Sequence, residues 1–468
     1  MPTHALRADR SPQLAWVAAA LAVSSLLPPS AAGQESAAPT ASAEAAPERV
    51  LVIRAGRLVV RPGQVIEGAQ VLVRGGTIRA VGTSLVVPEG AQVLEAPVVC
   101  AGFFDVWSQI GLDPAVLIDR SAGAATRMAD GLDLYAQGYL FAEALRGGIT
   151  AVRVQGALPS RFSGQGVAVR TAPVDETLPE RRLLDDSAGL WVTATEGDAF
   201  DRIEAVERFV AAVEAGRKYR ESQVKFEREF GEWQKKIAEE QAKLEKEFKN
   251  AKKKRDKALA DAKEKGKEFA EEKYKEDKAP KAPRFDRDNE VLAAIAAGEQ
   301  PAFVQADRLP EIRALLAALP RLGGARVVLV GAAEAHLCAY ELAEAGMPVI
   351  LAPGDEEAGS RFGIHPLERA AALERAGVYL LLGSGPGSPY ASRDLPLAAA
   401  RAVAFGLDAD SALAALTVRP ARLLGLESEL GSVEVGKAAD LLLLSGDPLG
   451  SATQVQAVIA NGQPVTLP

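Results

Sequence analysis

The sequence predicts an α/β protein: a (β/α)8 TIM-type barrel, a composite β-sandwich domain from both chain ends, and a charged helical insert. Three observations support this fold. Short β-branched runs punctuated by Gly and Pro occupy both ends of the chain. Between them, strands alternate with helices, which indicates a parallel sheet with covered faces. Residues 217–284 differ from both patterns, because they hold 23 of the 54 Lys and Arg residues and 16 of the 62 Asp and Glu residues.

Residues 1–33 are predicted to be a signal peptide. Arg7 and Arg10 precede an apolar run from Leu14 to Leu27 that is short for a bilayer span, and small residues suited to cleavage follow. An uncleaved anchor is the alternative. Residues 34–48 are rich in Ala, Pro, Ser and Glu, which predicts a disordered linker. We therefore expect an exported protein, periplasmic or extracellular, with no membrane association once the signal is cleaved.

The predicted β domain combines residues 49–99 with residues 422–468. Neither end alone has enough strands for a stable sheet, so one domain built from both is the economical interpretation. Gly75-Gly76 and Asn461-Gly462 are hairpin signals. The expected strands are Val50–Ile53, Arg57–Val60, Ala69–Val73, Thr77–Val81, Ala439–Leu444, Val455–Ala460 and Pro464–Leu467.

Residues 100–421 form the predicted barrel, with its first strand beginning slightly earlier. Repeated strand–helix units of this length fit a closed barrel better than an open sheet. The expected strands are Val98–Val106, Ile149–Val154, Leu190–Ala194, Ala302–Ala306, Arg326–Val330, Pro348–Leu351 and Val378–Leu382. The expected helices are Leu140–Arg146, Leu309–Leu319, Ala333–Ala345, His365–Ala376 and Leu395–Phe405.

The charged insert, residues 217–284, is predicted to be a long helix or a helical hairpin. Six large apolar residues from Phe226 to Phe248 are spaced 4, 3, 4, 7 and 4 positions apart, which is typical of one helical stripe in a coiled coil. The stripe should pack on the barrel, on a returning helix with Phe269 and Tyr274, or on a second protomer. Its charges are most simply a solvated face, and a binding role is the alternative.

Composition excludes several functions. Outside the insert the chain has 31 basic and 46 acidic residues, and this acidic balance argues against nucleic-acid binding. Cys100 and Cys338 are too few for a disulfide scaffold and lie in apolar runs typical of buried thiols. The three histidines are His4, His336 and His365, and His4 lies in the predicted leader. A site with three imidazole ligands is therefore excluded.

Residues 69–82, 101–105, 412–425 and 431–442 resemble the metal-dependent amidohydrolase superfamily, in its imidazolonepropionase-like branch. The run from Gly431 to Leu442 resembles the strand–turn signature of that superfamily's composite β domain. The resemblance implies a hydrolase of carbon–nitrogen bonds other than peptide bonds. It also implies zinc or another divalent ion that activates water and polarises the substrate.

The resemblance places the superfamily's metal-ligand positions on residues that do not bind metals. These positions are Trp107 and Gln109 on the first strand, Gln305 on the fifth, Val330 or Gly331 on the sixth, and Gly385 on the eighth. Indole, amide and glycine do not replace imidazole and carboxylate around zinc. We therefore expect no metal cofactor and a degenerate copy. We also expect that His at 107, 109 and 305 with Asp at 385 would restore some metal affinity.

Seven residues near the predicted carboxyl ends of barrel strands form the candidate pocket, because this face carries function in such barrels. They are Asp105, Trp107, Gln109, Gln305, Asp307, Ser384 and Gly385, with Asp394 in the loops beyond. No catalytic residue is singled out, since Asp105 is equally a structural carboxylate and Ser384 has no evident histidine partner. His336 is interpreted as a helix-face residue, and His365 as a helix cap or a loop residue.

Two functions from different classes remain open. The first is a non-catalytic exported barrel, a pseudoenzyme, that binds a small molecule or a protein and can form a homo-oligomer. The second is an active hydrolase of carbon–nitrogen bonds with an atypical or metal-free site. The composite β domain is compatible with both because it supports fold rather than chemistry. The replaced ligands favour the first.

Overall fold

The computed structural model describes residues 50–466, except residues 114–115, 119, 136, 157, 159, 176–177, 266–278 and 354–363. The predicted signal peptide and linker lie outside these residues. Among the helices in the described ranges, none combines the length and apolar character that crossing a bilayer requires.

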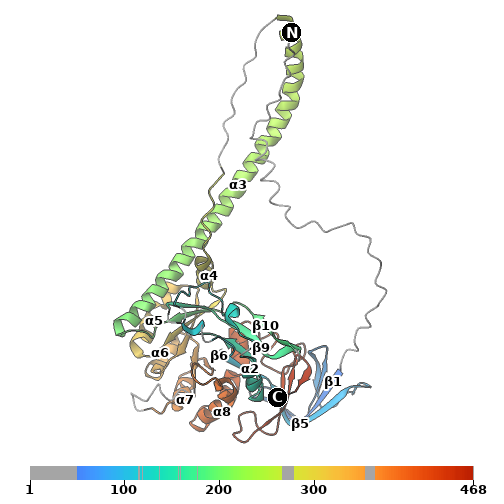
Figure 1. Ribbon diagram of the computed structural model, residues 1–468, viewed down its shortest axis with the longest axis vertical. Helices are drawn as coiled ribbons and strands as arrows, with labels where there is room; N and C mark the ends of the chain where they lie inside the picture. The colour runs from blue at the N-terminus through green and yellow to red at the C-terminus, as the bar shows by residue number, and fades with distance from the viewer. Residues whose placement is uncertain are drawn as a thin grey trace. The chain divides into compact units, whose positions relative to one another are not determined.

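An eight-stranded sheet contains strands from both ends of the described chain (Figure 1). Its order is β18-β17-β16-β5-β1-β3-β4, and β2 pairs with β1. Strand β16 runs antiparallel to β5, with Leu441 opposite Ala101, so the C-terminal strands extend the N-terminal sheet. The strands are β1 (Val50–Arg61), β2 (Gln64–Glu67), β3 (Gln70–Arg74), β4 (Thr77–Gly82), β5 (Gln92–Ala101), β16 (Leu441–Leu444), β17 (Val455–Ala460) and β18 (Gln463–Val465). The two strands expected between Val50 and Val60 are one continuous strand.

The barrel strands form two mixed sheets, where the sequence predicts a single parallel barrel. One has the order β10-β9-β7-β6 and the other β15-β14-β13-β12-β11-β8. A backbone hydrogen bond links one edge of each sheet, from Gly385 N to Trp107 O at 2.8 Å. The strands are β6 (Phe103–Ser108), β7 (Ile149–Val154), β8 (Phe162–Gln165), β9 (Val167–Asp175), β10 (Leu178–Asp185), β11 (Leu190–Thr193), β12 (Pro301–Ala306), β13 (Arg326–Gly331), β14 (Val349–Leu351) and β15 (Leu380–Leu382).

The departure from eight parallel strands arises between β7 and β11. Among the described residues between β7 and β8 there is no helix, and β9 turns back to pair antiparallel with β7. Strand β8 likewise pairs antiparallel with β11. The sequence prediction missed β8, β9 and β10, and the parallel order holds only for β6 with β7 and from β11 to β15.

The expected strand Val98–Val106 is divided at Gly102, where the chain passes from β5 to β6. Gly102 N donates to Asp440 O at 2.9 Å, which ties this junction to the C-terminal segment. A Cβ at this position would overlap the side chain of Thr150 on β7. Glycine is therefore required where the two sheets meet.

The helices lie in the barrel segment and pack on its strands around one large apolar core. They are α2 (Gly138–Arg146), α4 (Arg287–Ala296), α5 (Leu309–Leu322), α6 (Ala339–Glu344), α7 (Glu368–Arg375), α8 (Ala391–Ala404), α9 (Ala409–Ala415) and α10 (Val418–Leu423). The expected helix Ala333–Ala345 is instead a 3-10 turn, Ala335–Cys338, followed by α6. Ala332 has a φ of 58° and the Glu334 carboxylate accepts from Leu309 N at 2.9 Å, so this segment starts as a turn.

Helix α3 (Ala199–Lys265) carries the charged insert and begins well before it (Figure 1). Its first turns are buried in the barrel core through Val206, Phe209, Val210 and Val213. Further along, Phe226 and Phe230 stack at 5.5 Å between ring centroids, as the spacing of the apolar stripe predicts. Phe248, Phe269 and Tyr274 lie outside the residues whose side chains are described, so the coiled coil stays a prediction.

Candidate functional site

A cavity of about 50 Å³ lies at the carboxyl ends of β6, β12, β13 and β14. Three of the predicted pocket residues line it, namely Trp107, Gln305 and Asp307. The other lining residues are Gly331, Leu351, Ala352, Pro353, Pro366, Leu367, Arg369, Ala370 and Pro386. The cavity is therefore on the face where barrel proteins carry their sites.

Two lining residues present polar atoms without partners. Trp107 is 2% exposed, and its ring centroid lies 5.5 Å from that of Trp191. Among the described residues, neither the Trp107 Nε1–H nor the Gln305 Oε1 has a hydrogen-bond partner. Buried polar groups are normally paired, so this donor and this acceptor are exceptions among the described residues.

A buried guanidinium lies in the barrel interior beneath these residues. Arg153 on β7 is fully buried, and its Nε donates to Ala188 O at 2.6 Å. Its guanidinium carbon lies 3.7 Å from the ring centroid of Phe303, which is two residues before Gln305 on β12. Burial lowers the pKa of Arg153 to about 9, and the group remains charged at neutral pH. The sequence prediction missed it, although a charged residue inside an apolar strand was a usable signal.

Asp105 is held in a hydrogen-bond network and does not line the cavity. Its Oδ1 accepts from Ser384 N at 2.9 Å and Trp107 N at 3.2 Å, and its Oδ2 accepts from Ser392 Oγ at 2.7 Å. Burial raises its pKa, and these hydrogen bonds oppose that rise. The Ser384 hydroxyl donates to Trp107 O at 3.1 Å. These hydrogen bonds connect β6 with the segment after β15, so the role of Asp105 here is structural.

Two of the expected metal-ligand positions cannot carry a side chain without strain. Gly385 has a φ of 70°, and a Cβ there would lie 2.8 Å from the Cβ of Ala352. Gly331 has a φ of 85°, and a Cβ there would overlap the carboxylate of Asp307. At position 385 a side chain would meet both a positive φ and the close contact with Ala352, which opposes the expectation that Asp there helps restore metal affinity. That expectation stays a prediction.

The described residues do not fit a divalent metal. Among them, no three His, Cys, Asp or Glu side chains are grouped so that they could hold an ion. His336 is half-buried in the turn before α6, and burial together with Arg369 lowers its pKa. His365 Nδ1 accepts from Leu367 N at 3.2 Å in the loop before α7. Leu367 is the N-cap of α7 and no side chain caps this helix, so His365 has the loop role of the two that the sequence allows.

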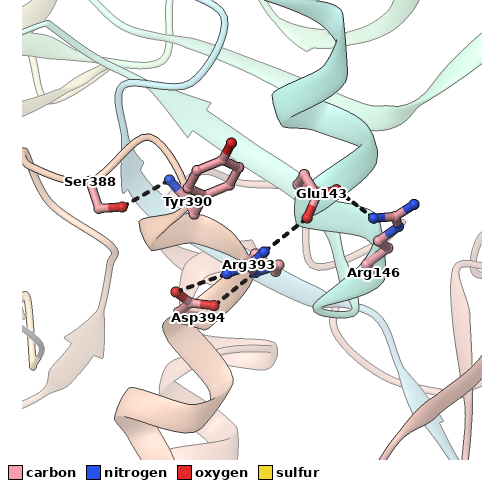
Figure 2. Close-up of polar contacts among 6 residues, drawn as sticks. All are labelled: Glu143, Arg146, Ser388, Tyr390, Arg393 and Asp394. Atoms are coloured by element: carbon pink, nitrogen blue, oxygen red, sulfur yellow. Dashed lines mark hydrogen bonds and ion pairs between the residues drawn. The ribbon is translucent and has the colours of Figure 1, made fainter. Parts of the chain in front are cut away.

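Gln109 and Asp394 lie outside the cavity lining. Gln109 is half-buried just beyond the end of β6. Figure 2 shows Asp394 on α8 paired with Arg393, whose guanidinium also reaches Glu143 on α2. The Arg393 guanidinium carbon lies 5.0 Å from the ring centroid of Tyr390. This cluster joins α8 to α2 and is partly exposed to solvent.

Arg369 on α7 is a lining residue that the sequence prediction missed. Its side chain is buried, and its Nε donates to Pro366 O at 3.0 Å. Its Nη1 donates to Ala333 O at 3.3 Å, so it connects α7 to the loop after β13. An arginine among Leu367, Ala370 and Ala371 on an otherwise apolar helix face was the available signal.

Comparison with known proteins adds three findings. Residues 256–466 match the model of the amidohydrolase family. The chain is 34% identical over 162 residues to imidazolonepropionase from Maricaulis maris, covering 32% of this chain and 37% of that protein. It is 36% identical over 110 residues to imidazolonepropionase from Sphingopyxis alaskensis, which covers 23% of this chain and 27% of that protein. The matches thus span about a third of the length of these relatives.

One solved structure shares most of the chain's fold. An amidohydrolase from Thermotoga maritima aligns with a TM-score of 0.64 at 23% identity, over 89% of this chain and 99% of that one. At 23% sequence identity, this structural similarity shows a shared fold and carries no conclusion about activity.

Proposed function

We propose that this chain, which belongs to the amidohydrolase superfamily, is a non-catalytic member that binds a ligand at the carboxyl ends of its barrel strands. The observation that carries the proposal is the buried indole of Trp107, at a position where the sequence resemblance places a metal ligand. A packed aromatic ring there leaves hydrolytic water without the ion that would activate it. Gly331 and Gly385, where a side chain would be strained, support the same conclusion at two further such positions.

Asp105 is the group that would serve a metal-free hydrolase, because burial raises its pKa toward a range useful for proton transfer. Its oxygens, however, accept hydrogen bonds from Ser384, Trp107 and Ser392. A carboxylate engaged in this way is poorly placed to exchange protons with a substrate. We therefore treat hydrolysis as the outcome that would overturn the proposal.

The test is an assay of the purified mature protein on a panel of linear and cyclic amides, with and without added zinc and manganese. We expect no turnover above the uncatalysed rate under either condition. Turnover that a chelator or the Asp105→Asn substitution abolishes would show an active carbon–nitrogen hydrolase. The Arg54→Met variant, altered in an exposed ion pair, is the matched control.

Export is the second part of the proposal, and it rests on the sequence pattern of residues 1–33. The test is fractionation of cells that express the full chain, with the mature N-terminus read by mass spectrometry. We expect a periplasmic or extracellular product that begins near residue 34. A cytoplasmic product that retains Met1 would contradict it.

A further inference from the structure

We propose that α3 pairs with the α3 of a second copy of this chain, and that the two helices form an antiparallel coiled coil along residues 226–255. The surface that pairs is the apolar stripe, which consists of Phe226, Phe230, Trp233, Ile237, Leu244 and Phe248. The first four of these side chains are described, and each is half-buried and stands apart from the apolar cores of the described chain. The barrel core therefore does not extend to this part of the stripe, and a large apolar stripe on a charged helix needs a cover.

The chain between α3 and α4 is too short to return as a helix that covers the stripe. The Asp286 N–H donates to the Tyr219 hydroxyl at 3.4 Å, so the chain must come back from Lys265 to the level of Tyr219. At 1.5 Å per residue, α3 covers about 69 Å between Tyr219 and Lys265. A helix over residues 266–286 would cover only about 32 Å. In the described part of this connection, Phe285 is 68% exposed and so does not cover the stripe. These lengths favour a cover from another chain.

The spacing of the stripe is symmetric, which suits antiparallel pairing with an identical helix. When Ala251 and Arg255 are added to the stripe, its positions are 4, 3, 4, 7, 4, 3 and 4 residues apart, the same in both directions. Two identical antiparallel helices share a two-fold axis, here between Glu240 and Gln241, and make the same contacts on both sides of it. The levels that this axis brings together are Phe230 with Ala251, Trp233 with Phe248 and Ile237 with Leu244 of the second copy.

The charges of α3 favour the antiparallel direction over the parallel one. Residues 226–240 carry five acidic and three basic side chains, whereas residues 241–255 carry two acidic and seven basic ones. An antiparallel pair sets the acidic half of each helix against the basic half of the other, and a parallel pair sets the two basic halves together. Opposite charges also meet at the positions that flank the stripe, where coiled coils select their partners. These pairs are Glu227 with Lys252, Glu229 with Lys254 and Lys236 with Glu247 of the second copy.

The first test is the association state of the mature protein, measured by sedimentation equilibrium over a range of concentrations. We expect a dimer. Ile237→Glu places a charge inside the paired stripe, twice in each dimer, and should raise the dissociation constant at least about a hundredfold. Val224→Glu is the matched control, because Val224 is 58% exposed on the same helix and lies outside the stripe, and it should dimerise as the parent does. A cooperative thermal transition in each variant confirms that its barrel is folded.

Disulfide formation under mild oxidation tests the direction of the pair. In the antiparallel register, position 241 lies within one residue of the level of its own counterpart, so Gln241→Cys should give a disulfide-linked dimer. Position 251 lies about 32 Å along the helix from its counterpart, so Ala251→Cys alone should not. A mixture of Ala251→Cys and Phe230→Cys should cross-link, because the register sets these two positions level. The natural thiols, Cys100 and Cys338, are buried, and the parent measures their background.

Three results would overturn the inference. A parent that stays monomeric at the highest concentrations would show that no second copy covers the stripe. An unchanged dissociation constant in folded Ile237→Glu would place the interface elsewhere on the molecule. Self-cross-linking of Ala251→Cys as readily as Gln241→Cys would show a parallel pair. These results concern α3 alone, so the proposed function of the barrel stands or falls separately.

Discussion

The buried carboxylate of Asp105 accepts a 2.9 Å hydrogen bond from the backbone N–H of Ser384, far away in the sequence. The contact joins β6 to the segment after β15, at the seam between the two barrel sheets. Asp105, next to the expected metal-ligand pair, therefore helps to hold the two barrel sheets together. Its burial predicts how the stability of the protein depends on pH.

Burial raises the pKa of Asp105 above its ordinary value of 3.8, so its carboxyl group favours the protonated form more strongly in the folded than in the unfolded chain. The associated stability is fully present below pH 3.8 and is lost as the pH rises through the folded pKa. Asp105→Asn cannot titrate, and its amide oxygen still accepts from Ser384 N. We expect the parent to lose stability relative to the variant as the pH rises from about 4 to 7. Urea unfolding of both proteins across this range measures it, and parallel pH profiles would refute it.

Gly385→Ala should destabilise the protein by about 3 kcal/mol, because it combines an unfavourable left-handed backbone with overpacking against Ala352. Gly425 is the matched control, since its φ of 73° is similar and no atom lies within 4 Å of the added Cβ. Gly425→Ala should cost about 1 kcal/mol. Chemical denaturation compares them. Equal losses would show that Ala352 does not restrict position 385, and Ala352→Gly should partly rescue Gly385→Ala.

Arg170→Met should destabilise the fold by about 3–5 kcal/mol, since it leaves a buried carboxylate unpaired. Arg170 on β9 is 2% exposed, and its Nε lies 2.7 Å from Asp440 Oδ2 beside β16. The control is Arg54→Met, which removes an exposed pair with Glu95 and should change stability by less than about 1 kcal/mol. Urea unfolding of both variants is the measurement. A small effect at Arg170 would mean that this ion pair does not secure the eight-stranded sheet to the barrel.

Replacing residues 226–282 by a short Gly/Ser link should leave the barrel folded, because long surface excursions add little closure entropy. The cut is placed after Gln223, whose side chain donates to Glu290 at 2.6 Å, as does the nearby Tyr219 hydroxyl at 2.8 Å. These contacts hold the start of the excursion near α4. Thermal unfolding should shift by a few degrees at most. Loss of the cooperative transition would show that the segment belongs to the core.

A cut that begins earlier in α3 should unfold the chain. Val206, Phe209 and Val213 lie in the barrel core, and Arg202 pairs with Glu311 at 3.3 Å at the start of α5. Removing residues 206–282 would expose that core. A folded product from this deletion would contradict the placement of α3.

Several elements could be predicted from the sequence because local patterns decide them. The β-branched runs at both ends, the hairpin at Asn461-Gly462 and the apolar strands from Leu190 to Leu382 lie where the pattern places them. The start of α3 could not be located by composition, because the helix continues unbroken from a buried barrel segment into the charged insert. The antiparallel β8 and β9 depend on contacts with distant strands, which local patterns do not reveal.

The candidate site was predictable in part for a similar reason. Trp107, Gln305 and Asp307 meet at one cavity because they lie at the carboxyl ends of β6 and β12. Arg153 and Arg369 were missed, because an isolated arginine in an apolar run does not show whether it faces solvent or the core. The obstruction at Gly385 comes from Ala352 on another strand, so only the structure could reveal it.

Elemental analysis of tag-free mature protein tests the central claim most directly. Because the resemblance places metal ligands at Trp107 and Gly385, and neither indole nor glycine binds a divalent ion, we predict zinc, iron and manganese each at less than about 0.1 per chain. Protein from zinc-supplemented cultures should give the same result. About one equivalent of any of these metals per chain, removed by a chelator together with hydrolytic activity, would contradict the account.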